Sequence, residues 1–222
     1  MSDLRLLFSK TDTARYISHL DLMRTFQRAF LRAGVPVRHT EGFNPHAYIS
    51  ILLPLSVGFS SECEILEFGL AGEAVIPEII QRLSLALPAG ITPHRCYGSE
   101  RPVKQLTFTD YIVTMEYEGR SPSGVVNAFR SLLSQESLVV TKKSKKAKSG
   151  QVQVDIIPLI HWVSFEERED TIIMDAVLRA QNPGLNPELL ITALRHGCPE
   201  LAPDFVTYHR KAVLDEDLRP FE

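Results

Sequence analysis

The amino-acid sequence predicts an α+β protein made of two tandem ferredoxin-like, or split βαβ, units. In the first half of the chain, apolar patterns follow one another in the order strand, helix, strand, strand, helix, strand, and the second half repeats that order. The 222 residues also suffice for two domains of about 100 residues each. We therefore expect an N-terminal unit at 1–97, a linker at 98–107 and a C-terminal unit at 108–222.

Helix signals and apolar runs place the elements of the first unit. Ser18 and Asp21 form a capping-box-like pair at a helix start, and Gly34 followed by Pro36 ends that helix near residue 33. Pro77 is typical of the first turn of a second helix. The expected strands are residues 4–9, 47–54, 63–70 and 91–97.

The second unit repeats the order around an added lysine-rich loop at 142–150. Its helices are expected at 125–133 and from Asn186, as cap, to about His196, with Gly197 ending the second one. Alternation of apolar and polar residues predicts a half-buried strand at 152–156. The other expected strands are 108–118, 138–141, 159–165, 171–178 and 205–214.

Composition limits the classes of function. There are 24 Lys and Arg against 27 Asp and Glu, a net charge of −3, so any nucleic-acid binding must depend on a local patch. Cys63, Cys96 and Cys198 are far apart and match no metal or cluster spacing, which predicts no metal site and free thiols in the cytoplasm. No apolar run approaches the length of a membrane span. The sequence contains no phosphate-binding loop that would indicate a nucleotide cofactor, and we expect no cofactor.

The start of the first helix carries the first candidate site. Ser18, His19 and Asp21 cluster there, and His19 is a candidate acid, base or ligand because imidazole titrates near neutral pH. A packing role for a histidine beside a helix cap is the alternative. Three arginines at four-residue spacing form a row without an acidic partner at i±4, which favours anion binding over an ordinary solvated face: Arg24, Arg28 and Arg32.

The second candidate site is the turn at 42–46. Gly, Asn and Pro predict a tight bend that holds Phe43, Asn44 and His46, although the pattern equally fits a turn without a ligand. We predict that His19 and His46 line one cleft, with Asn44 orienting the turn and Arg24 near the rim.

Five lysines in seven residues form the third candidate site. Lysines that neutralise phosphates release counterions, so this loop predicts RNA-backbone binding, while a solubilising loop is the alternative. These residues are Lys142, Lys143, Lys145, Lys146 and Lys148.

The runs RYISHLDLMRTFQRAFLRAGVPV, EGFNPHAYISILLPLSVGFSSECE and VQVDIIPLI resemble the bacterial radical-SAM-linked family of unknown function. Its members follow, or are fused to, a cobalamin-type radical-SAM protein, so the resemblance implies such a partner. Ile157 stands where the family form VDIRPLI has arginine. The resemblance carries over by position to Ser18, His19, Leu20, Asp21, Arg24, Gly42, Phe43, Asn44, Pro45, His46, Asp155 and Pro158.

Two hypotheses of function follow. The favoured one is a non-catalytic accessory module that binds RNA or a protein substrate and presents it to the radical-SAM partner. The alternative is an RNA-processing endoribonuclease that uses His19, by analogy with tandem ferredoxin-like CRISPR endoribonucleases. The glycine-rich loop that those enzymes carry near the C-terminus is absent from this sequence. No catalytic residue is assigned, and His19 and His46 are the candidates.

Overall fold

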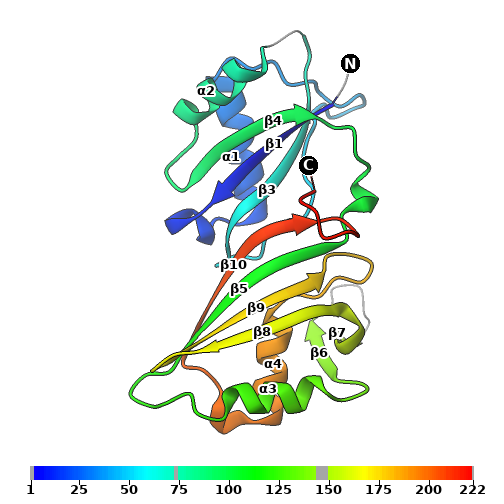
Figure 1. Cartoon of the computed structure of the whole chain (residues 1–222). Coiled ribbons are helices and arrows are strands. Elements are labelled where there is room, and N and C mark those ends of the chain that lie inside the picture. The colour runs from blue at the N-terminus through cyan, green and yellow to red at the C-terminus, as the bar shows by residue number, and fades with distance from the viewer. Residues whose placement is uncertain (1–2, 73–74, 144–149, 222) are drawn as a thin grey trace. The chain divides into compact units, whose positions relative to one another are not determined.

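The computed structural model describes residues 3–72, 75–143 and 150–221 and shows an α+β fold with four α-helices in that part of the chain (Figure 1). The chain divides into two compact units between Gln105 and Leu106, at the segment expected to be a linker. We call the N-terminal part unit 1 and the C-terminal part unit 2. Of the helices described, none is long and apolar enough to cross a membrane.

Unit 1 is a four-stranded antiparallel sheet with two helices. Along the sheet the strands follow the order β4, β1, β3, β2. Helix α1 follows β1, and helix α2 connects β3 to β4. The bounds are β1 (Asp3–Lys10), α1 (His19–Arg32), β2 (Ile49–Ile51), β3 (Ser60–Gly69), α2 (Ile76–Ala86) and β4 (Ile91–Gly98).

The core of unit 1 forms where the apolar face of α1 meets the sheet. Phe26 and Phe30 lie one turn apart on α1 and are buried, because residues four apart share one face of a helix. The Phe26 ring meets Phe8 of β1 edge-on at 4.8 Å, and the Phe30 ring lies 4.8 Å from Phe68 of β3. These contacts fix α1 against the two central strands and thereby set the direction in which its outer face points.

Unit 2 has the same arrangement with one addition. Its sheet follows the order β10, β5, β9, β8, again with antiparallel pairing throughout. The addition is a separate two-stranded hairpin, β6 with β7. The bounds are β5 (Phe108–Glu116), α3 (Val125–Leu133), β6 (Val139–Lys143), β7 (Gln151–Asp155), β8 (Ile160–Glu167), β9 (Thr171–Arg179), α4 (Glu188–Gly197) and β10 (Phe205–Leu214).

Alternation along the strands builds the core of unit 2. Val113 and Met115 of β5 and Met174 of β9 are buried, while their neighbours in the chain are less so. Phe129 of α3 stacks on Phe165 of β8 with ring centroids 5.1 Å apart. The helices therefore pack on one face of the sheet, as in unit 1.

Most predicted elements appear within two or three residues of their expected bounds, and the second strand is the main exception. A strand was expected over 47–54, but β2 contains only Ile49–Ile51. The ladder pairs these three residues with Leu66 to Phe68 of β3, and Pro54 lacks the N–H that a longer ladder needs.

Candidate functional site

The start of α1 is closed by a reciprocal cap. The Ser18 hydroxyl accepts the Asp21 backbone N–H at 3.2 Å and donates to the Asp21 carboxylate at 2.7 Å. The hydrogen bond from the Ser18 hydroxyl to the Asp21 carboxylate lowers the pKa of Asp21. The Arg24 guanidinium, with Nη1 3.1 Å from Oδ1 of Asp21, lowers it further. Ser18 and Asp21 thus contact each other, while the adjacent His19 is exposed.

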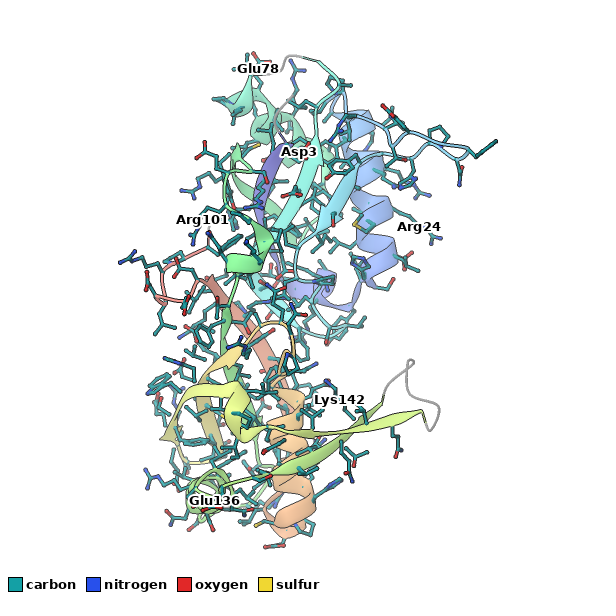
Figure 2. The ribbon with its side chains drawn as sticks, turned by 90° about the vertical axis from the view of Figure 1, so that its right-hand side faces the viewer. Asp3, Arg24, Glu78, Arg101, Glu136 and Lys142 are labelled. Carbon is teal, nitrogen blue, oxygen red and sulfur yellow. The ribbon has the colours of Figure 1, made fainter. Side chains whose placement is uncertain are left out.

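The arginine row on α1 is partly engaged within unit 1. Arg24 forms an ion pair with Asp21, which lies three residues earlier on the helix. The prediction of an unpaired row considered acidic partners only at four residues' distance and therefore missed this pair. Arg32 donates to the backbone oxygen of Ala86, at the end of α2, at 2.6 Å. Arg28 is exposed, and Figure 2 shows Arg24 pointing away from the helix into solvent.

The second candidate site is an exposed hairpin at 39–47. The Thr40 backbone N–H donates to the His46 oxygen at 2.8 Å, and the Thr40 hydroxyl lies 3.1 Å from Nδ1 of His46. The same Nδ1 lies 3.2 Å from the backbone oxygen of Asn44. His46 therefore closes the turn through its own side chain, and Phe43 at the tip is fully exposed.

Arg38 anchors the base of this hairpin to the sheet. Its guanidinium lies 4.4 Å from the centroid of the Tyr48 ring and pairs with Asp3 of β1 at 2.8 Å. Its backbone N–H donates to Gly69, the last residue of β3. The hairpin thus extends from the edge of the sheet where β1 begins and β3 ends.

The predicted cleft between His19 and His46 is wrong. His19 begins α1 just beyond the other end of β1, where Lys10 pairs with Ser61 at the start of β3. The hairpin of His46 lies at the Gly69 end. The 14 residues of α1 span roughly 21 Å at 1.5 Å each, so the two histidines occupy opposite ends of the helix. The return segment extends away from the sheet as a hairpin and does not run back along the helix.

The third candidate site is the hairpin of β6 and β7, which we call the arm. Figure 2 shows it passing α4 with Lys142 labelled on it, and α4 and β6 are in contact. Lys142 and Lys143 end β6, whereas Lys145, Lys146 and Lys148 lie outside the described residues.

Asp155 closes the base of the arm. Its carboxylate accepts the backbone N–H groups of Leu138 at 3.0 Å and Ile157 at 3.2 Å. These bonds, the Leu138 bond foremost, lower the pKa of Asp155. The predicted binding residue Asp155 thus positions the arm.

A cavity of about 500 Å³ lies between the arm and α4. Lys142 lines it from β6, and Glu188 and Arg195 line it from α4. Burial, and secondarily the Glu188 carboxylate, raises the pKa of Tyr208, another lining residue from β10. In the part of the chain that the structure describes, the lining comprises Thr141, Lys142, Gly184, Asn186, Glu188, Leu189, Thr192, Arg195 and Tyr208.

Sequence reasoning missed the contribution of α4 to this cavity. Glu188, Thr192 and Arg195 follow the spacing i, i+4, i+7, which places them on one helix face. That spacing is a usable signal once the helix is predicted, but it does not show that Lys142 lies opposite. Across the described residues, no group of three or more His, Cys, Asp or Glu side chains is arranged to hold a metal ion.

Residues 3–187 match the family DUF2344, described as "Uncharacterized protein conserved in bacteria". The chain belongs to this family. No curated protein matches the DUF2344 chain.

Two solved structures are similar to the DUF2344 chain at low sequence identity. A chain of the "Crystal Structure of a Cbf5-Nop10-Gar1 Complex" aligns with a TM-score of 0.54 and 8% identity over 96% of this chain. The alignment covers 50% of that other chain, so the protein spans about half its length. An unknown protein from Galdieria sulphuraria aligns at 12% identity over 94% of this chain and 98% of its own, with a TM-score of 0.28. The first similarity concerns the fold alone.

Proposed function

We propose that this DUF2344 protein is a non-catalytic accessory module that binds single-stranded RNA and presents it to a partner enzyme. The observation that carries the proposal is the arm of unit 2, whose strand β6 ends in Lys142 and Lys143. Three further lysines follow before β7 begins, and no acidic residue occurs between Glu136 and Asp155. A run of cations without carboxylates attracts the phosphates of a nucleic acid and releases their counterions.

The arm favours RNA over a folded protein as its ligand. Lysine side chains on a hairpin contact a flexible polyanion at several points, whereas a stable protein interface needs a buried apolar centre. Phe43 adds an exposed ring in unit 1, and aromatic rings that stack on unpaired bases are a common means of binding single strands.

The partner enzyme is proposed to be a radical-SAM protein, and the support is the sequence resemblance at 18–24 and 42–46. We also propose that each unit is ferredoxin-like. The support is the order of strands in the two sheets. In unit 1, β1 lies between β4 and β3, and β2 lies at the edge beside β3. In unit 2, β5 lies between β10 and β9, and β8 lies at the edge beside β9, which is the same ferredoxin-like order. A cytoplasmic location is proposed from Cys63, Cys96 and Cys198, which are free thiols.

The test replaces the five lysines of 142–148 with glutamine in the full chain and measures binding of an oligouridylate over a salt series. We expect weaker binding and a salt slope that falls by about 0.7 for each phosphate that the variant no longer neutralises. A variant with the same change in net charge, in which five exposed cations elsewhere become glutamine, is the control and should bind normally. Its substitutions are at Arg82, Lys104, Arg130, Arg168 and Arg219.

Equal losses in both variants would show that net charge, and not the arm, determines binding. An unchanged slope in the lysine variant would contradict the proposal outright. The same incubation tests the nuclease alternative, because the RNA should remain intact. Cleavage that disappears in His19→Ala would replace the proposed module with an endoribonuclease.

A further inference from the structure

We propose that the cavity between the arm and α4 binds one ribonucleotide, with Lys142 and Arg195 holding its phosphate and Glu188 facing its ribose. The inference rests on the proposed RNA binding and adds a defined site for one residue of the RNA. It requires no residue outside unit 2, because the described lining residues all belong to the range 141–208.

The two cations of the cavity are available for a ligand. Among the described residues neither Lys142 nor Arg195 has an ion-pair partner, although other exposed cations, such as Arg120 and Arg168, are paired. Lys142 comes from β6 and Arg195 from α4, so they approach the cavity from two different elements. A guanidinium binds two phosphate oxygens through parallel N–H groups, and an ammonium adds a second positive charge.

The charge of the cavity matches one phosphate group. Among the described lining residues, Lys142 and Arg195 contribute two positive charges and Glu188 contributes one negative charge, which leaves a net charge of +1. A phosphodiester carries a single negative charge, so it neutralises this excess. A doubly charged cavity without Glu188 would suit inorganic phosphate better than a residue within an RNA chain.

The positive and negative groups are separated along α4. Arg195 follows Glu188 by seven residues, or about 10 Å at 1.5 Å each, on the same helix face. The Glu188 carboxylate accepts a hydrogen bond from the Asn186 amide at 3.3 Å and retains lone pairs for other donors. Neighbouring ribose hydroxyls are such donors, since acidic side chains bind ribose in this way in dinucleotide sites. The 2′-hydroxyl would therefore distinguish RNA from DNA.

The size and the remaining walls suit a nucleotide. About 500 Å³ lies within the range of small-ligand pockets, roughly 300–1,000 Å³. Leu189 and the Tyr208 ring supply apolar surface for a base. The nucleotide could be free or part of an RNA chain, and the experiment separates these sources.

The experiment is calorimetry on the full chain with the methyl ester of uridine 5′-monophosphate, a phosphodiester with a single negative charge, and with its 2′-deoxy analogue, uridine and inorganic phosphate. We expect the ribonucleotide to bind more tightly than the other three. Lys142→Gln and Arg195→Gln should each weaken its binding roughly tenfold or more. Glu188→Gln should reduce the preference for ribose over deoxyribose. Arg130→Gln, an exposed arginine on α3, is the matched control and should leave binding unchanged.

Amide spectra of the unmodified protein supply a readout that does not depend on folded variants. Titration with the ribonucleotide should shift signals of Thr192, Arg195 and Tyr208. The proposal is overturned if those signals do not move, if inorganic phosphate binds as tightly as the nucleotide, or if both cation variants bind normally.

The oligouridylate measurement separates this inference from the proposed function. If the oligouridylate binds through the arm lysines but the mononucleotide fails to bind, the cavity inference is wrong and the RNA-binding module stands. If the mononucleotide binds and the oligouridylate does not, the cavity is a site for free nucleotide and the RNA proposal is wrong.

Discussion

Phe43 and Phe26 are two phenylalanines of unit 1 with opposite surroundings, and replacing each with alanine tests whether the hairpin at 39–47 binds ligand. Phe43 is fully exposed at the tip, so Phe43→Ala removes no buried area. We expect the free energy of unfolding to change by no more than about 0.5 kcal/mol, as for other exposed positions.

Phe26→Ala is the contrasting substitution. Phe26 is 0% exposed, and the centroid of its ring lies 4.8 Å from that of Phe8 and 6.4 Å from that of Phe30. Truncating a buried phenylalanine removes its apolar transfer energy and leaves a cavity, which costs about 3–5 kcal/mol. Urea unfolding should therefore show a large loss of stability for Phe26→Ala and almost none for Phe43→Ala.

Binding of the oligouridylate then assigns the role of Phe43. A ring that stacks on one base contributes about 1–3 kcal/mol, or a roughly 5- to 150-fold change in affinity. Phe43→Ala should lose this affinity, and Phe43→Trp should retain it, because both rings offer a flat face. Unchanged affinity in Phe43→Ala, or a stability loss comparable to that of Phe26→Ala, would refute the reasoning.

Three further predictions concern stability and reactivity. Ser18→Ala removes the cap of α1 and should cost about 1 kcal/mol in urea unfolding, while Ser18→Asp should restore most of it. Gly90→Ala should destabilise the protein more than Gly119→Ala. Both glycines have a positive φ, but only at Gly90 would the new Cβ lie 2.6 Å from the Thr11 backbone oxygen. Equal losses of stability in the two variants would exclude this steric cause. Burial raises the pKa of Cys96 to about 11, so a thiol reagent should not label it in the folded protein near neutral pH. The usual pKa of a cysteine thiol is about 9. Cys96 should therefore reduce stability as pH rises from about 9 to about 11. Cys96→Ala should lessen this loss, part of which remains because the pKa of Tyr208 is also raised.

Local patterns were sufficient to predict the helices and most strands. The Ser18–Asp21 pair predicted the start of α1, and the apolar spacing at 125–133 predicted α3 at its observed bounds. Such signals depend on neighbours within four residues, which helix geometry brings together whatever the rest of the chain does. The lysine-rich composition of the arm was likewise readable in the sequence.

Tertiary structure decided which of these residues lie together. His19 and His46 looked like partners in the sequence, but sheet register places them at opposite ends of α1. Lys142 and Arg195 are separated by 53 positions, and contact between β6 and α4 brings both to one cavity. The physical reason is that strand pairing and helix packing are set by the burial of apolar faces over the whole unit, so the positions of exposed polar groups follow from it and cannot be read from their spacing along the chain.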